Sequence, residues 1–309
     1  MALAPEYKLH REGKWRLLVL PEKWHGNLWA EVLDRLASAE PRKHPQTVRL
    51  SAARAEGAGY YLKIYSPSSG GGAIKDLLRD SKAVRALKQG AALSRAGFHA
   101  PPAVAAGEER TFGALGRAFL LTSEIAAQPI AAVLRQRLAP PLDRQAVRKK
   151  RKWLAQLALE TRRLHRNGFV HGDLVASNIL AGFETDNAPT FFYMDNDRTR
   201  RYPSWFSHRP WRRNLVQLNR IVLPGISLQD RMRFLRIYLG EIPWGNRERR
   251  LVRWLEKKTR QRRKECERIE AKVSFRELMR WNGPFAKKSS RIVCPPSRRG
   301  NLPRRSQGQ

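Results

Sequence analysis

Residues 171–180 read HGDLVASNIL, and residues 194–198 read MDNDR behind the apolar run FFY. In the first stretch Asp173 and Asn178 lie five positions apart, after a helical pattern and before an apolar pair. In the second, Asp195 ends a short predicted strand. Phosphoryl transfer needs a base for the attacking hydroxyl and ligands for the metal ion that holds the phosphates. The two stretches therefore predict a phosphotransferase.

The spacing in HGDLVASNIL suggests a role for each polar residue. In a kinase catalytic loop the Asp accepts the proton of the attacking hydroxyl, and the Asn ligates a magnesium ion. Asp173 is thus the predicted base and Asn178 a predicted metal ligand. We count His171 with the catalytic group, although a histidine two residues before the Asp usually packs and does no acid–base work. The alternative interpretation of the stretch is a polar turn that caps a helix.

The acidic residues of MDNDR complete the predicted metal site. An apolar strand that ends in Asp195 would deliver its carboxylate to a metal on the phosphates. If the strand continues, Asp197 faces the same side and ligates a second metal. Its alternative role is a surface ion pair with Arg198 or Arg200. The distance along the chain from Asn178 leaves room for a β-hairpin, as in a kinase.

A lysine within an apolar strand is the third element. YYLKIY at 60–65 predicts a strand with Tyr61, Lys63 and Tyr65 on one face. An unpaired buried charge is costly, so the ammonium needs an anion, which in a kinase is the α/β-phosphate of ATP. A solvated lysine on an edge strand is the alternative. The following SPSSGGG (66–72) is interpreted as a flexible connector.

The order of these features along the chain is that of a kinase. After the lysine strand, 116–125 predicts a buried strand that ends in a hinge, where Glu124 and Ile125 would contact the nucleotide. A kinase glycine-rich loop precedes its lysine, and the nearest glycine-containing turn ahead of Lys63 is 53–59. That turn is a weak match to a phosphate-binding loop.

The amino-acid composition limits which partners and which cellular compartment we expect. The 309 residues include 61 Lys and Arg against 27 Asp and Glu, a formal net charge of +34. Such a surface attracts nucleic acid, an anionic membrane face or phosphorylated glycans. Cys266 and Cys294 show no metal-ligand spacing, which favours a reducing compartment. Because no run of about 18 apolar residues occurs and the N-terminus is polar, we expect a cytoplasmic protein at a membrane surface.

The pattern predicts an α+β protein with the two-lobed, protein-kinase-like fold. Residues 1–125 are expected to form a small β-rich lobe with one helix that binds ATP. Residues 126–285 would form a larger helical lobe with the catalytic loop and the metal site. Residues 286–309 are basic and acid-free, and predict a disordered tail. Strands are predicted at 14–20 and 47–53, and helices at 74–98, 151–168, 214–223, 228–239 and 246–273.

These motifs together resemble the protein-kinase-like superfamily, and within it the bacterial lipopolysaccharide kinases that phosphorylate Kdo or heptose of the inner core. The narrower resemblance covers roughly residues 45–260 and rests on HGDLVASNIL, MDNDR, DLLRDSKAVRALKQGAALSRAGF, RRNLVQLNR and LQDRMRFLRIYL. It implies that Lys63 holds the phosphates of ATP, that Asp173 is the base, and that Asn178 and Asp195 bind Mg²⁺. The implied acceptor is a core glycolipid.

Two departures from the protein-kinase pattern have consequences. The helix after the lysine strand contains no Glu, so either Lys63 pairs elsewhere, for example with Asp195, or that helix aligns differently. Gly172 stands where regulated protein kinases place an Arg that reads a phosphate on the activation loop. We therefore predict activity that does not depend on activation-loop phosphorylation. The aromatic and Arg-rich segment 201–215 could bind a phosphorylated or carboxylated sugar.

Three functions remain open at this point. The first is a sugar kinase that acts on a lipid-linked glycan at the cytoplasmic face of the inner membrane, with anionic lipids drawing in the basic stretch 246–264 and the tail. The alternative for that stretch is a solvated helix packed through Leu251, Val252 and Leu255. The second function is an atypical RNA-associated serine/threonine protein kinase. The third is a non-catalytic nucleic-acid-binding protein on an inactive kinase fold.

Overall fold

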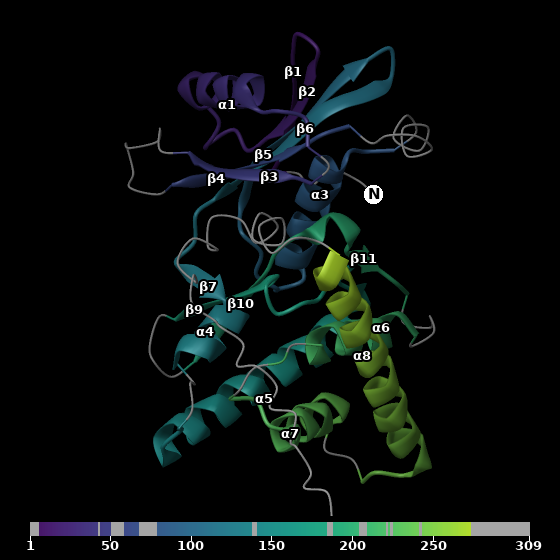
Figure 1. The fold of residues 1–309 in the computed structure, drawn as a ribbon. Coiled ribbons are helices and arrows are strands. Elements are labelled where there is room, and N and C mark those ends of the chain that lie inside the picture. Colours follow the sequence, from purple (N-terminus) through teal and green to yellow (C-terminus); the bar gives the residue numbers. More distant parts are fainter. Residues whose placement is uncertain are drawn as a thin grey trace, which may run out of the picture. The chain divides into compact units, whose positions relative to one another are not determined.

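Six strands from the first half of the chain form one antiparallel sheet in the order β1-β2-β5-β6-β4-β3 (Figure 1). Their bounds are β1 (Lys8–Glu12), β2 (Trp15–Val19), β3 (Gln46–Leu50), β4 (Tyr60–Tyr65), β5 (Ala103–Thr111) and β6 (Ala114–Ser123). The computed structural model describes residues 6–42, 44–50, 59–67, 79–137, 141–183, 188–203, 209–220, 222, 225–240 and 243–272. Within these, β4 has the bounds predicted for the lysine strand.

The side chains of β4 alternate between the two faces of the sheet, and each face is covered by a helix. Leu62 and Ile64 are buried in a cluster with apolar residues of α1 (Gly26–Ser38). Tyr65 points to the other face and packs with residues of α3 (Lys82–Arg95). Each fully buried side chain of this size contributes roughly 2 kcal/mol through the hydrophobic effect. The predicted alternation is confirmed, and it puts Lys63 on the face that α3 covers.

The second half of the chain is mainly helical, as predicted. It also contains short strands, which form a three-stranded sheet β10-β9-β7 and a β11-β8 pair. The helices are α4 (Ile130–Arg137), α5 (Arg144–Arg166), α6 (Arg209–Asn219), α7 (Leu228–Leu239) and α8 (Asn246–Lys272). The strands are β7 (Ala127–Pro129), β8 (Phe169–Val170), β9 (Ile179–Phe183), β10 (Pro189–Tyr193) and β11 (Arg200–Arg201), and η1 (Asn196–Arg198) is a short 3-10 turn.

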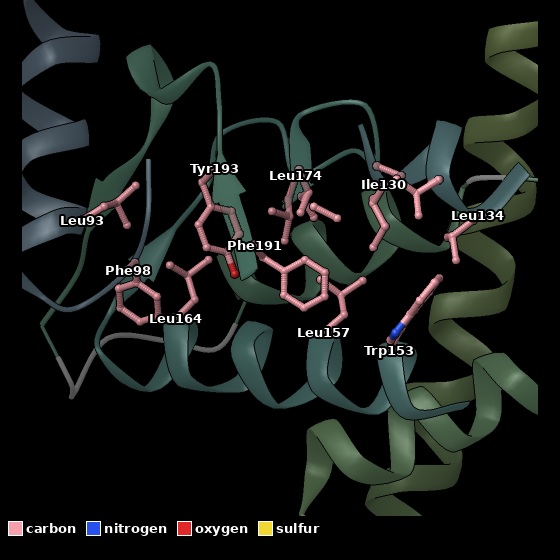
Figure 2. Packing of buried hydrophobic residues seen from close by; sticks show 14 of the residues in the cluster. Leu93, Phe98, Ile130, Leu134, Trp153, Leu157, Leu164, Leu174, Phe191 and Tyr193 are labelled. Carbon is pink, nitrogen blue, oxygen red and sulfur yellow. The ribbon is translucent and has the colours of Figure 1, made fainter. Parts of the chain in front are cut away.

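The apolar face of α5 supports the segments that carry the predicted chemistry. Leu157 and Leu164 of α5 lie in one buried cluster with Leu174, from the HGDLVASNIL loop, and with Tyr193, at the end of β10. Figure 2 shows these side chains gathered above the helix. Close packing in such a cluster leaves each member little freedom. The loop and the strand end are therefore held against the same helix.

Several predicted boundaries are confirmed and others are wrong. Gly168 and Gly97 have positive φ angles of 82° and 75° just beyond the ends of α5 and α3, where glycine commonly terminates a helix. α5 begins earlier than predicted because Asp143 caps it, accepting a hydrogen bond from the backbone N of Ala146 at 2.6 Å. The strand β5 was not among the predicted strands.

Some predictions fall on residues that the structure does not describe. These are the ends of the predicted strand 47–53 and helix 74–98, most of the 53–59 turn and of the 66–72 connector, and the tail 286–309. Residues up to Arg268 group into one compact unit, and 269–309 into a second, of which only the last turn of α8 is described. The lobe boundary at residue 125 stays a prediction. No helix among the described residues combines the length and apolar character needed to cross a bilayer.

Candidate active site

The loop between β8 and β9 brings the predicted base and the predicted amide ligand together. The Nδ2 of Asn178 donates to the backbone carbonyl of Asp173 at 3.0 Å and lies 3.4 Å from its Oδ2. Two backbone bonds of 2.9 Å, from Val175 N to Asp173 O and from Asn178 N to Val175 O, close the loop tightly. The five-residue spacing thus places both side chains on one side of a compact turn.

His171 ties this loop to the segment that leads to Asp195. Its Nδ1 accepts from the backbone N of Asp173 at 3.1 Å, and its Nε2 donates to the carbonyl of Met194 at 2.7 Å. Burial lowers the pKa of His171, although the Met194 contact and nearby carboxylates oppose this. The ring is therefore neutral at neutral pH, with its proton on Nε2. Both ring nitrogens bind backbone groups, which is a packing arrangement of the kind predicted.

The chain turns sharply after β10, so Asp195 and Asp197 do not share a strand face. β10 ends at Tyr193, and Asp195 has left-handed backbone angles of φ 57° and ψ 48°. Asn196 stabilises the turn by donating from its side chain to the carbonyl of Tyr193 at 2.8 Å. The strand does not continue, because this bond and the η1 turn redirect the backbone, so the condition set for Asp197 is not met. Asp197 follows within η1 instead.

Lys63 contacts the carboxylate of Asp195 directly. α3 contains no acidic residue, and of the two alternatives drawn from that gap the structure shows the first, a pairing with Asp195. Burial raises the pKa of the Asp197 carboxyl; Lys63 opposes the shift and Asp195 adds to it. A buried carboxyl of raised pKa gains from a nearby cation, because the cation stabilises its charged form.

The oxygen atoms at this place fit a magnesium ion. Mg²⁺ prefers oxygen ligands and usually takes one or two carboxylates together with substrate phosphates. The amide nitrogen of Asn178 is turned toward Asp173, so its Oδ1 would be the atom that binds a metal. The Asp195 side chain is 44% exposed, and Asp197 is the half-buried second carboxylate. Among the described residues, no group of three or more His, Cys, Asp or Glu could hold a metal ion. Phosphate oxygens are the usual further ligands of Mg²⁺ in kinase sites.

The predicted hinge residues lie at the end of β6. The backbone N of Glu124 donates to the carbonyl of Gly59 at 2.7 Å. Its carboxylate accepts from Arg49 at 2.6 Å and from the Tyr61 hydroxyl at 3.3 Å. The hydrogen bond from Arg49 is the main cause that lowers the pKa of Glu124. Since the side chain is engaged in this way, a nucleotide contact by Glu124 or Ile125 would use backbone atoms.

Two residues of α6 that were not singled out from the sequence contact the catalytic loop. Gln217 Nε2 lies 3.2 Å from Oδ1 of Asp173 and 3.2 Å from the carbonyl of Gly172. Asn214 is buried and accepts from the backbone N of His171 at 3.1 Å. The signal was present in RRNLVQLNR, where the two amides lie three residues apart and so share a helix face. Of the predicted acceptor segment 201–215, residues 204–208 lie outside the described part of the chain.

A lysine on a strand, a carboxylate and an amide in one loop, and a second carboxylate after a hairpin define a kinase-like phosphotransferase. The model of the "Lipopolysaccharide kinase (Kdo/WaaP) family" matches residues 27–238, more than half of the chain. The chain belongs to this family of kinases.

A solved structure supports the fold. "WaaP in complex with acyl carrier protein" is similar to this chain with a TM-score of 0.56 at 22% sequence identity, over 80% of this chain and 98% of that one. At this identity the similarity shows a kinase-like fold. A comparison with curated protein sequences gives no match.

Proposed function

We propose that the protein transfers the terminal phosphoryl group of ATP to a sugar hydroxyl of the lipopolysaccharide inner core, on Kdo or heptose. The observation that carries this proposal is the convergence of three segments, which hold Lys63 on β4, Asp173 and Asn178 in the loop between β8 and β9, and Asp195 after β10. Family membership supports the reaction class and the kind of substrate.

Each residue of the site has a role in this reaction. Asp173 accepts the proton of the attacking sugar hydroxyl, which makes the oxygen a better nucleophile. Lys63 exchanges its contact with Asp195 for the phosphates of ATP, which offer a higher negative charge. Mg²⁺, held by Asn178 and Asp195 with Asp197 as a further ligand, supplies charge neutralisation of the phosphates when bound. His171 holds the loop against the Asp195 segment, because its ring bonds to the backbone of Asp173 and to that of Met194.

The proposal includes the two-lobed organisation. Residues 1–125 would hold the nucleotide between the sheet and the hinge at Glu124 and Ile125, and residues 126–285 would supply the base and the metal ligands. The contact between Lys63 of β4 and Asp195 of the turn after β10 supports it, because one reaction centre then draws on both halves.

We also place the protein in the cytoplasm at the inner membrane surface. The apolar side of α8 is not available for insertion, because Leu251, Val252 and Leu255 pack with apolar residues of α6 and α7. Exposed basic residues of α8 face solvent for anionic lipids and for the charged core glycolipid, among them Arg253, Lys257, Lys258 and Lys264. Each contributes about 1 kcal/mol near such a surface. Nucleic acid is the second candidate for the same basic face.

The test compares wild type with Asp173→Ala and with Asp34→Ala, an exposed aspartate on α1 as control. Each protein receives labelled ATP, Mg²⁺ and purified core glycolipid, and in parallel casein or an RNA-associated protein. We expect label on the glycolipid, a loss of about 10²- to 10⁴-fold in Asp173→Ala, and no change in the control. Label on protein alone would support the protein-kinase alternative. Equal absence of turnover in wild type and Asp173→Ala would support an inactive fold.

A further inference from the structure

A continuous chain of side-chain hydrogen bonds runs from α7 to the carboxylate of Asp173. Tyr238 OH lies 2.8 Å from Nδ1 of His165, and Nε2 of His165 lies 3.1 Å from Oδ1 of Asn214. Nδ2 of Asn214 donates to Oε1 of Gln217 at 2.9 Å. Nε2 of Gln217 then lies 3.2 Å from Oδ1 of Asp173. Three helices, α5, α6 and α7, are thereby linked to the predicted base.

The backbone fixes the direction of both amides in this chain. The Oδ1 of Asn214 accepts from the backbone N of His171 at 3.1 Å, and its Nδ2 donates to the carbonyl of the same residue. The Oε1 of Gln217 accepts from the backbone N of Leu174 at 3.1 Å, and its Nε2 donates to the carbonyl of Gly172 at 3.2 Å. A backbone N–H only donates and a carbonyl only accepts, so neither amide can be reversed.

The direction of the amides sets the tautomer of the histidine. The Oδ1 of Asn214 is an acceptor, so Nε2 of His165 carries the proton and Nδ1 accepts from the hydroxyl of Tyr238. Burial lowers the pKa of His165 to about 4, which keeps the ring neutral at neutral pH. In each of the four bonds, therefore, the donor is on the Tyr238 side and the acceptor on the Asp173 side. Bonds aligned in this way polarise one another.

Gln217 is held firmly at the end of the chain. Its two N–H groups donate to Gly172 and Asp173. Its carbonyl oxygen accepts from Leu174 and Asn214. The side-chain amide thus makes every hydrogen bond that it can make. The other oxygen of Asp173 faces the amide of Asn178 at 3.4 Å. An amide therefore stands against each oxygen of the carboxylate.

We infer that Gln217 is a positioning residue for the catalytic base, and that the chain behind it fixes the N–H that it presents to Oδ1 of Asp173. This inference rests on the proposed function, in which Asp173 takes the proton of the sugar hydroxyl. A base must hold its oxygen within hydrogen-bond reach of that proton, and a carboxylate that rotates loses this geometry. The aligned dipoles also stabilise the charged carboxylate without reorganising during the reaction.

The matched experiment changes one atom of Gln217. Gln217→Glu keeps the shape and the accepting oxygen but replaces the N–H that faces Asp173 with an acidic oxygen. We expect kcat to fall about 10²-fold, as for other preorganised donors, with a change in KM for ATP below about threefold. The acidic limb of the kcat/KM profile is expected to move to higher pH. Tyr238→Phe removes only the far end of the chain and should lower kcat by about two- to fivefold.

The control makes the same change elsewhere. Gln156 of α5 donates to the carbonyl of Pro189 at 2.8 Å, outside the site, and Gln156→Glu should leave both kcat and the pH profile unchanged. Gln217→Glu adds a carboxyl beside Asp173, while the charged and titratable groups already present are unchanged: His171 in the loop, Asp195 and Asp197 after β10, and Lys63 on β4. A shift of the acidic limb in Gln217→Glu therefore comes from the change at position 217.

The outcomes separate this inference from the proposed function. If wild type phosphorylates the glycolipid and Gln217→Glu matches it in kcat and pH profile, the inference is wrong and the proposed function stands. A Gln217→Glu protein with lower activity but an unchanged acidic limb would make Gln217 merely structural. If wild type does not phosphorylate the glycolipid, the side-chain amide ¹H–¹⁵N signals of Gln217 still test the contact with Asp173. These signals should shift in Asp173→Ala, and unchanged signals would overturn the inference.

Discussion

The ammonium of Lys63 lies against the carboxylate of Asp195, although 132 residues separate them in the chain. α3 provides no glutamate as a partner for Lys63, and the lysine pairs instead with a carboxylate on the turn after β10. α3 places a positive charge, Arg85, near this region, where it opposes the rise that burial causes in the pKa of Asp197. Lys63 and Asp195 each have another proposed partner, the phosphates and Mg²⁺, so nucleotide binding would separate them by giving both a stronger partner.

The first prediction concerns this lysine. Lys63→Met should lower kcat/KM by about 10²-fold or more, because a fixed positive charge on the transferring phosphates is lost. Lys88→Met is the control, since Lys88 of α3 forms a comparable pair, at 2.6 Å, with Asp80, which is not a residue of the candidate site. Steady-state kinetics with ATP and core glycolipid provide the measurement. Equal activity of the two variants would contradict a phosphate-binding role for Lys63.

Gly172 carries the second prediction, on stability. A Cβ at this position would overlap the Cβ of Arg198 and approach its carbonyl oxygen to 2.7 Å. Gly172→Ala should therefore lower the free energy of unfolding by about 1–3 kcal/mol, the usual cost of overpacking. Gly26→Ala is the control, because nothing lies within 4 Å of its Cβ. Urea unfolding followed by circular dichroism measures both variants.

The same glycine bears on regulation. An arginine cannot fit where even a methyl group clashes, so the loop has no room for a side chain that reads a phosphate. Wild-type protein treated with phosphatase should keep its full turnover. A loss of turnover that returns after rephosphorylation of a residue following MDNDR would refute this prediction.

Local patterns in the sequence were sufficient to predict the structural parts of the candidate site that lie within one segment. The alternation of YYLKIY defines β4 to the residue, because a strand with two different faces imposes that pattern. The spacing of Asp173 and Asn178 describes one loop, and the structure closes that loop as expected. The family was also recognisable, since its motifs are short and ordered along the chain.

The features of the fold and of the candidate site that were not predicted depend mainly on contacts between distant segments. The turn at Asp195 is set by the Asn196 side chain and by the bond from Met194 N to Asn178 O at 2.9 Å, so an apolar run alone suggested too long a strand. A role for Gln217 can be inferred only once the structure shows α6 beside the loop, where Gln217 contacts Asp173. The helix α1 was not predicted at all, although His25 caps it and its buried face includes Leu28 and Val32.

The third prediction is a pH dependence of stability that originates at His165. Burial lowers its pKa to about 4, against about 6.5 in the unfolded chain. The unfolded state therefore binds more protons between these values, so stability is complete above about pH 6.5 and falls as the pH drops toward 4, by up to about 1.4 kcal/mol per unit. Buried His171 acts in the same direction.

Thermal unfolding at a series of pH values measures this dependence. His165→Gln should lose part of the slope between pH 6.5 and 4, while His10→Gln, at an exposed position of β1, should keep it. The remaining slope in His165→Gln is expected to come from His171. An unchanged slope in His165→Gln would show that His165 is not buried in the neutral form.

The fourth prediction concerns the ion pair that joins α5 to the start of α7. Lys150 Nζ lies 2.8 Å from Oδ2 of Asp230, and both side chains are more than nine-tenths buried. Burial raises the pKa of Asp230, but bonds from Lys150 and Ser227 outweigh it and the net shift is downward. Asp230→Ala should cost about 3–5 kcal/mol, because it strands a buried ammonium. Glu256→Ala, which breaks an exposed pair with Arg260, should cost less than about 1 kcal/mol.

Acid provides an independent measurement of the same pair. Because the folded pKa of Asp230 is depressed, its contribution is complete above the unfolded value of about 3.9 and is lost as the pH falls through the folded value. Wild type should therefore lose stability below about pH 4 more steeply than Asp230→Asn, which cannot titrate there. Chemical unfolding at pH 3 and pH 6 compares the two proteins. If Asp230→Asn loses as much between these values as wild type does, Asp230 is not stabilised in its charged form and the cost predicted for Asp230→Ala must have another origin.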